Sequence, residues 1–382
     1  MRLPAGFQTA GIKAGLKPSG KLDLGVIHSR YPLYWALMST ENTFRAPCVS
    51  RNRARFISEQ PVNGVVVNSG NANCATGEQG TWDNEDFAGL AANALSLDRV
   101  QNILTASTGV IGRRLPVDKL RVALPQLATQ MSENSDAFAE AILTTDTVVK
   151  QVGVTLEGGG RIVGVAKGSG MIHPNMATML AFVMTDANLT QQELRTLWAQ
   201  VVGDTFNQVT VDGDTSTNDM ALVFSTHQAR VDANEFRLAL GGVCERLAKK
   251  IARDGEGATK LLTVQVRGAR DTQEARAAAR AVAKSSLVKA AVHGNDPNWG
   301  RILNALGSCG AVVDAAQLLI SLQGTDVYLG APKEFDTGEL SAAMKAEEVV
   351  ITVDLGAGGG SAQAWGCDLS SDYVRINAEY TT

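Results

Sequence analysis

The chain has 382 residues, of which 45% are hydrophobic and 19% are charged, and this balance predicts a folded globular protein rather than a disordered one. A formal net charge of −4 argues against a nucleic-acid scaffold. No apolar run approaches the roughly 20 residues that a membrane helix needs, and the first residues lack the apolar segment of a signal peptide. We therefore expect a cytoplasmic protein.

The cysteines and histidines give no pattern of a metal site. The five cysteines are scattered without a CxxC pair, and none of the four histidines is spaced with a cysteine or a second histidine as metal ligands are. This distribution predicts reduced thiols, no disulfide framework and no catalytic metal.

Apolar spacing and turn residues predict the elements in chain order. After a turn-rich stretch at 1–60, the expected elements are a strand at 63–67, helices at 83–97 and 117–132, strands at 148–156 and 161–166, a strand from 179, a helix at 190–203, a strand and polar loop at 206–219, a helix at 233–252, a strand at 261–267 and a helix at 272–284. From Ser285 the pattern changes to a smaller α+β lobe, and the chain is expected to end in a strand and short tail from Tyr373 to Thr382.

The most informative stretch runs from Lys167 to Leu180, with the sequence KGSGMIHPNMATML. It predicts a strand, an irregular Gly/Pro loop and a buried strand, with Thr178 at the junction of loop and strand. A hydroxyl at such a junction is held by the strand and exposed by the loop. Threonine is also common at the start of a strand, so the spacing alone fits a structural role as well.

Two further stretches combine small hydroxyl residues with turn residues. Thr105–Gly112 (TASTGVIG) places hydroxyls beside glycine, where a backbone N–H group can approach a ligand closely. Leu143–Thr147 (LTTDT) follows a predicted helix. Each stretch alone is most often a turn, and neither identifies a chemistry by itself.

The uninterrupted KGSGMIHPNMATML motif, with matching blocks from near Gly6 to Thr382, resembles the ornithine acetyltransferase family, the glutamate N-acetyltransferases of arginine biosynthesis. The resemblance implies an α+β fold, a layered α/β/β/α sandwich with a smaller C-terminal α+β lobe. It also implies self-cleavage between Ala177 and Thr178, which gives pieces 1–177 and 178–382. The second piece would include the lobe from about 285 to 382, and two copies of each piece would form a heterotetramer.

The resemblance also implies the reaction and its residues. Thr178 would take the acetyl group from N2-acetyl-L-ornithine and pass it to L-glutamate, while Thr108 and Gly109 stabilise the oxyanion. The residues that the resemblance assigns to the substrate are Thr145, Lys167, Thr178, Glu256, Asn377 and Thr382. Within the LTTDT block, Thr144 remains an alternative to Thr145.

The chemistry of an N-terminal threonine fits this assignment. Its α-amine has an ordinary pKa of about 7.7–8.0, so cleavage before Thr178 would create a nucleophile and its base in one residue. This reaction needs no cofactor or metal. Some members of the family also accept acetyl groups from acetyl-coenzyme A, and that co-substrate stays open here.

Two other functions remain as alternatives. An N-terminal-nucleophile amidase or aminopeptidase shares the self-cleaving chemistry, but it admits water to the acyl-enzyme. A binding protein that keeps the fold without cleavage is the third hypothesis, and the intact Ala177–Thr178 pair argues against it.

Overall fold

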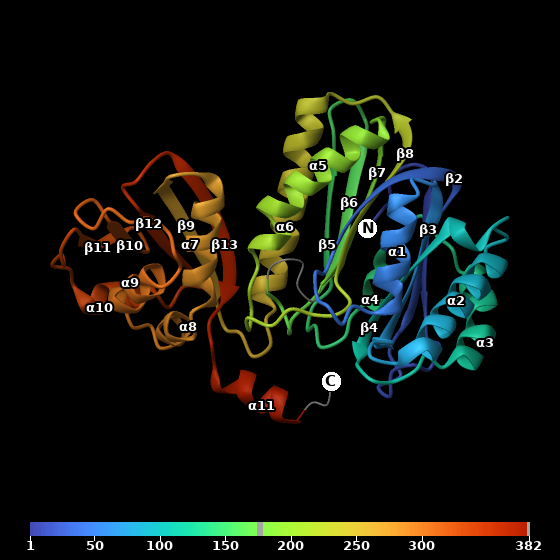
Figure 1. Ribbon diagram of the computed structural model, residues 1–382, viewed down its shortest axis with the longest axis horizontal. Helices are drawn as coiled ribbons and strands as arrows, with labels where there is room; N and C mark the ends of the chain where they lie inside the picture. Colours follow the sequence, from blue (N-terminus) through green and yellow to red (C-terminus); the bar gives the residue numbers. More distant parts are fainter. Residues whose placement is uncertain (174–178, 380–382) are drawn as a thin grey trace.

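The computed structural model describes residues 1–173 and 179–379. The predicted residues Ala177, Thr178 and Thr382 lie outside this part of the chain. The described residues form two lobes, each built on one β-sheet (Figure 1).

The larger lobe contains a sheet of eight strands among the described residues. Its strands are β1 (Phe7–Ile12), β2 (Leu24–Ser39), β3 (Val62–Asn71), β4 (Ile103–Val110), β5 (Lys150–Thr155), β6 (Arg161–Lys167), β7 (Leu180–Ala187) and β8 (Met220–Ala229). Its helices are α1 (Pro47–Ile57), α2 (Gly77–Ala94), α3 (Val117–Ala128), α4 (Asp136–Ala141), α5 (Gln191–Asp204) and α6 (Ala233–Arg253), with 3₁₀ turns η1 (Val100–Asn102) and η2 (Phe206–Gln208). The strand order is β4-β3-β2-β8-β7-β6-β5, and β1 pairs with β2.

Strand β2 joins the two halves of this sheet. Its first part pairs with β3, and its last part, from Tyr34 to Ser39, pairs with β8. Apolar side chains of both halves meet in one central core, which includes Val65 of β3 and Phe182 of β7. Helices α2 and α3 cover the outer face of one half, and α5 and α6 cover the other (Figure 1). The lobe is therefore the α/β/β/α sandwich expected from the sequence.

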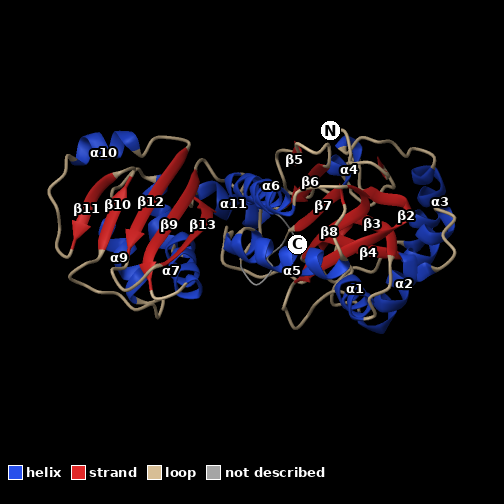
Figure 2. Cartoon of the chain, turned by 90° about the horizontal axis from the view of Figure 1, so that it is seen from above, coloured by secondary structure: helices blue, strands red, loops and turns tan. Residues whose placement is uncertain are grey.

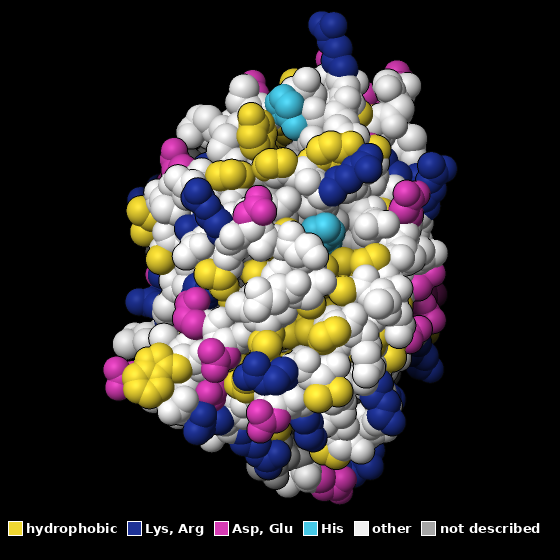
Figure 3. Space-filling model, turned by 90° about the vertical axis from the view of Figure 1, so that its right-hand side faces the viewer, with side chains coloured by type: hydrophobic (Ala, Val, Ile, Leu, Met, Phe, Trp, Pro, Cys, Tyr) yellow, Lys and Arg dark blue, Asp and Glu magenta, His cyan; other side chains and the backbone are white. Residues whose placement is uncertain are grey.

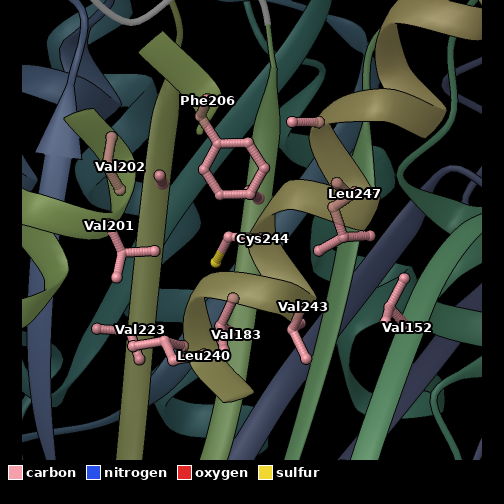
Figure 4. Packing of buried hydrophobic residues seen from close by; sticks show 14 of the residues in the cluster. Val152, Val183, Val201, Val202, Phe206, Val223, Leu240, Val243, Cys244 and Leu247 are labelled. Atoms are coloured by element: carbon pink, nitrogen blue, oxygen red, sulfur yellow. The ribbon is translucent and has the colours of Figure 1, made fainter. Parts of the chain in front are cut away.

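Helices α5 and α6 cover their half of the sheet with apolar faces. Phe236, Leu240, Val243 and Leu247 recur at helical spacing along α6, and all four are fully buried. Figure 4 shows Leu240, Val243 and Leu247 in this packing. Burying such a side chain contributes about 1.5–3 kcal/mol. Helix α5 begins at the predicted capping box of Thr190 and its partner three residues later.

The smaller lobe carries a second sheet, in the order β11-β10-β12-β9-β13. Its elements are β9 (Leu261–Ala269), α7 (Thr272–Lys284), α8 (Ser286–His293), α9 (Trp299–Gly307), β10 (Leu319–Leu322), β11 (Thr325–Leu329), α10 (Thr337–Ala343), β12 (Glu348–Asp354), β13 (Gly360–Cys367) and α11 (Ser371–Glu379). The lobe begins at Leu261 rather than near residue 285, because β9 pairs with both β12 and β13, more than 80 residues later in the chain.

Two predicted segments differ from the structure. Residues 1–60 are not mainly turns, since β1, the long β2 and α1 occupy most of them. The C-terminal segment is helix α11 rather than a strand. The β-branched Val374 and Ile376 favour a strand by propensity, but a helix turns Tyr373 and Ile376 to the same side, where both are half-buried.

The face formed by α2 and α3 carries no dominant charge (Figure 3). On the face formed by α2 and α3, acidic and basic side chains are interspersed with apolar ones (Figure 3). Trp82 and Val122 are the large apolar side chains most exposed on these two helices. Within residues 1–173 and 179–379, no helix is long and apolar enough to cross a membrane.

Candidate active site

A cavity opens at the end of the larger sheet where β4, β6 and the segment before β8 lie close together. The empty space between its walls, together with the part that is open to solvent, is about 600 Å³. The residues that line it are Ala72, Thr108, Gly109, Ile111, Thr144, Thr145, Lys167, Gly170, Met171, Ser216, Thr217, Asn218, Glu256 and Asn377. The structure thus brings six of the predicted site residues together from five separate stretches of the chain.

Thr108 and Gly109 lie near the end of β4, which pairs in parallel with β3. Thr108 is only 4% exposed. Gly109 has φ +130°, and a Cβ atom there would lie 2.4 Å from the carbonyl carbon of Gly70. Only glycine fits this position, because both the backbone conformation and the neighbouring strand exclude a side chain.

Lys167 ends β6 with its side chain in the cavity wall, where it is only 2% exposed. Its Nζ atom donates a hydrogen bond to Thr144 Oγ1 at 3.1 Å, while Thr145 Oγ1 shares a hydrogen bond of 2.7 Å with Ser169 Oγ. Burial lowers the pKa of Lys167, and the charges of Asp146 and other carboxylates oppose that change. Both threonines of the predicted pair therefore face the cavity, each with a different partner.

A buried charge network fixes the TTDT loop beneath this wall. Lys150 Nζ lies 2.6 Å from Asp146 Oδ1 and 2.5 Å from Asp254 Oδ2. Asp146 also accepts the backbone N–H of Gly168 at 2.6 Å, and Asp254 accepts hydrogen bonds from Thr147. Burial alone would raise the pKa of Asp146, but the charges of Lys150 and Lys167 hold it below its ordinary value. No sequence motif predicts this network.

Glu256 and Asn377 close the cavity from the side of the smaller lobe. Asn377 Nδ2 donates to Glu256 Oε2 at 2.9 Å, and Asn377 belongs to α11, which lies between the two lobes (Figure 2). The Glu256 backbone N–H donates to Ser169 O at 2.9 Å. A Cβ atom on Gly170 would lie 2.4 Å from the Glu256 carboxylate, so glycine is what lets this side chain approach the loop.

The loop after Lys167 is held up to its last described residue. Met171 has φ +56°, an uncommon conformation for a residue with a side chain. Asp212 accepts the N–H groups of Met171 at 2.5 Å and Ile172 at 2.9 Å. His173 Nδ1 lies 3.1 Å from Thr210 Oγ1, and burial lowers the pKa of His173 to about 4. A neutral imidazole held in this way fits a role in shaping the loop.

The first described residues after the predicted cleavage bond, Met179 and Leu180, lie at the same end of the sheet. Leu180, the first residue of β7, pairs with Lys167 of β6 and with Met220 of β8. Met179, which directly follows Thr178, is buried, and its N–H donates to Asp219 Oδ1 at 3.0 Å. No group of three or more His, Cys, Asp or Glu residues in the described part of the chain is arranged to hold a metal ion.

A layered α/β/β/α lobe with a polar cavity at the end of its central strands defines an α+β enzyme, and comparison with known proteins specifies its family. The ArgJ family model matches residues 8–382. The chain is 54% identical to "Arginine biosynthesis bifunctional protein ArgJ" of Thermus thermophilus, over all of both chains. It is 50% identical to the protein of the same name from Deinococcus radiodurans, over 99% of this chain and 97% of that protein. The chain therefore belongs to the ArgJ family.

A solved structure agrees with this membership. The crystal structure of Arginine biosynthesis bifunctional protein ArgJ from Bacillus halodurans is 44% identical to this chain, with a TM-score of 0.50. The match covers 52% of this chain and 98% of the solved chain. The fold predicted from the sequence is confirmed, whereas the roles of individual site residues remain predictions.

Proposed function

We propose that the protein transfers the acetyl group of N2-acetyl-L-ornithine to L-glutamate through an acyl-enzyme on Thr178, giving L-ornithine and N-acetyl-L-glutamate. The observation that carries this proposal is the convergence of Thr108, Gly109, Lys167 and Glu256 on one cavity. Relatives that share half of the residues over their full length are named for arginine biosynthesis. They give the amidase or aminopeptidase alternative no support.

The first step is self-cleavage. The Thr178 hydroxyl attacks the Ala177 carbonyl carbon, the acyl group moves from nitrogen to oxygen, and water hydrolyses the resulting ester. The products are residues 1–177 and a second piece with a free α-amine on Thr178. The solved Bacillus halodurans chain aligns along nearly its whole length with only half of this chain, which supports a protein in two pieces. The strained Met171, held by Asp212, supports a loop constrained ahead of the cleavage bond.

The transfer cycle uses the same groups twice. The α-amine of Thr178 removes the proton of the hydroxyl as the oxygen attacks the acetyl carbonyl, and that proton leaves with the ornithine amine. The glutamate amine then attacks the acetyl ester and restores the free hydroxyl. Thr108 and the backbone N–H of Gly109 stabilise the oxyanion of both steps. Losing one such donor typically costs about 100- to 1000-fold in rate.

The cavity offers opposite charges for an α-amino acid. Lys167 would bind the α-carboxylate that both substrates carry, because it is a buried cation beside Thr144. Glu256, held by Asn377, would face the side-chain ammonium of ornithine. Thr145 and Thr382 complete the proposed substrate contacts.

The proposed reaction also has implications for cofactors, cellular compartment and assembly. The chemistry uses the chain's own amine and hydroxyl, so we propose that it requires no metal or cofactor. Acetyl-coenzyme A is a second acetyl donor to be tested. The five cysteines are all free thiols, which supports a reducing cytoplasm. Two copies of each piece would assemble, with a total mass of twice 40.3 kDa.

Intact-mass measurement of the purified protein tests the proposal. We expect two pieces that meet at the 177–178 bond, and an acetyl adduct on the second piece after incubation with N-acetylornithine. Thr178→Ala should stay uncut and inactive.

Acetylornithine consumption should depend on added glutamate, whereas equal rates with and without glutamate would indicate a hydrolase. An active preparation with an unbroken chain would disprove the mechanism.

A further inference from the structure

Two neighbouring side chains just before β8 reach toward opposite halves of the candidate site. Asn218 is 4% exposed and Asp219 is 1% exposed. They follow each other directly in sequence and precede Met220, where β8 begins. Both residues lie in the predicted polar loop at 206–219, and no sequence motif marks either of them.

Asn218 binds the segments that carry the oxyanion residues. Its Nδ2 atom donates to Ser107 O at 2.8 Å and to Ala72 O at 2.7 Å, while its Oδ1 atom accepts from Thr217 Oγ1 at 2.6 Å. The Ser107 carbonyl belongs to the same planar peptide group as the N–H of Thr108. Asn218 therefore fixes the peptide plane that leads into the proposed oxyanion donors.

Asp219 binds the strand that follows the cleavage bond. Its Oδ1 atom accepts the Met179 N–H at 3.0 Å, which is the amide of the peptide bond after residue 178. Its Oδ2 atom has no hydrogen-bond partner among the described residues. Burial raises the pKa of Asp219 well above its ordinary value, and the charge of Lys167 opposes that rise.

We propose that Asn218 and Asp219 are positioning residues that hold the end of β4 and the start of β7 in a fixed relation for self-cleavage and acetyl transfer. The proposal rests on the function proposed above. It follows because β4 and β7 lie in different halves of the sheet, separated by β3, β2 and β8. A misplacement of about 1 Å between reacting groups costs on the order of 100-fold in rate.

The test at Asp219 compares removal of the acceptor with removal of the charge alone. We expect Asp219→Ala to slow self-cleavage by about 100-fold, and to lower kcat per cleaved molecule similarly with KM changed less than about twofold. Asp219→Asn keeps an oxygen that accepts the Met179 N–H, so it should restore both rates to within about tenfold of the unmodified protein. Equal losses in both variants would assign the effect to the charge and overturn the positioning role.

Asp186 gives a matched control for this pair of variants. It is a buried aspartate near the other end of β7, and it accepts the N–H groups of Arg161 at 2.7 Å and Ala5 at 3.1 Å. Asp186→Ala should lower the melting temperature without slowing self-cleavage beyond about twofold. A similar loss of rate in Asp186→Ala and Asp219→Ala would show a general effect of a lost buried carboxylate.

The test at Asn218 uses another buried asparagine that donates a hydrogen bond to the same strand, β4. Asn52 of α1 donates to Thr105 O at 2.8 Å, two residues before the carbonyl that Asn218 binds. We expect Asn218→Ala to reduce kcat and the self-cleavage rate by about 10- to 100-fold, and Asn52→Ala to reduce stability while keeping kcat within about threefold. Equal kcat values in the two variants would overturn the proposal.

Measurements on the unmodified protein distinguish failure of the proposed function from failure of the positioning role of Asn218 and Asp219. If it neither cleaves nor transfers acetyl groups, the proposed function fails. If it does both while the Asn218→Ala and Asp219→Ala variants match their controls, only the positioning role fails.

Discussion

Gly109 occupies a position where neither the backbone nor the surroundings admit a side chain. We expect Gly109→Ala to slow self-cleavage and transfer by at least about 100-fold, because the new Cβ atom would lie 2.4 Å from a β3 backbone carbon and displace the oxyanion donor. Gly112→Ala is the control. It also has positive φ, at +78°, but no atom lies within 4 Å of its Cβ position, so only stability should fall, by about 1–2 kcal/mol. Mass spectra recorded during expression follow self-cleavage, and acetylornithine consumption follows transfer. Normal cleavage in Gly109→Ala would remove this residue from the oxyanion role.

His173 links the loop before the cleavage bond to pH. Burial lowers the pKa of His173 from 6.5 to about 4. As the pH falls, His173 is therefore protonated near pH 6.5 in the unfolded chain but only near pH 4 in the folded chain. The stability that this group contributes is complete above pH 6.5 and declines as the pH falls toward 4. We expect His173→Asn to lose less unfolding free energy between pH 7 and pH 5 than the unmodified protein. Urea titrations at the two pH values measure this, and parallel losses would contradict it.

Sequence motifs located most of the residues that line the candidate site, but not the buried residues that hold them in place. The residues that the family resemblance marks, such as Lys167 and Glu256, do line one cavity. The network of Asp146, Lys150 and Asp254 was missed, because its members are separated by up to 108 positions and meet only in the folded chain. Sequence motifs therefore identify the residues proposed to take part in the reaction. The residues that hold them in place are identified only by tertiary contacts.

Helices with clear apolar periodicity and capping residues were predictable from the sequence. The long, irregular strand β2 was not. Helices α5, α6 and α7 begin within one residue of their predicted starts, because Thr190, Asp232 and Asp271 each cap a helix with a side chain. Strand β2 was missed because its pairing with β3 breaks between His28 and Leu33, around a polar, proline-containing stretch. Its role as the junction of two half-sheets depends on partners far along the chain.

Helix α11 carries a proposed substrate-binding residue, Asn377, but has little packing. None of its residues is buried, and its side chains reach the cavity through Asn377. We expect deletion of residues 371–382 to leave the melting temperature within about 3 °C, since a change of 1 kcal/mol shifts a large domain by only about 2–4 °C. Acetyl transfer should fall by at least about tenfold, while self-cleavage continues. The exposed Val374 gives a control, because Val374→Ser should alter neither rate.

Calorimetry, cleavage gels and acetylornithine assays on the same preparations decide this prediction. A large loss of thermal stability in the deletion variant would mean that α11 belongs to the core of the fold. Unchanged transfer would remove Asn377 and the C-terminal segment from substrate binding.

At the scale of the whole molecule, the proposed cleavage bond divides the sequence without dividing the fold. Strands β5 and β6 precede the bond and β7 and β8 follow it, yet β6 pairs with β7 and β2 pairs with β8. The central core draws apolar side chains from both sides of the bond, including Phe138 and Phe182, whose ring centroids lie 5.3 Å apart. Neither piece can bury its apolar surface alone, so both should remain associated after cleavage.

This interleaving predicts how stability depends on protein concentration. Unfolding of the cut protein releases two chains, whereas unfolding of the uncut Thr178→Ala variant releases one, so dilution should destabilise the cut form more. A tenfold dilution should lower its stability by about 1.4 kcal/mol beyond any change in the uncut variant. Urea titrations of both proteins at two concentrations, with native mass spectrometry to detect free pieces, provide the measurement. Release of one folded piece before the main transition would show that the two pieces have separate cores, contrary to the pairing of β6 with β7.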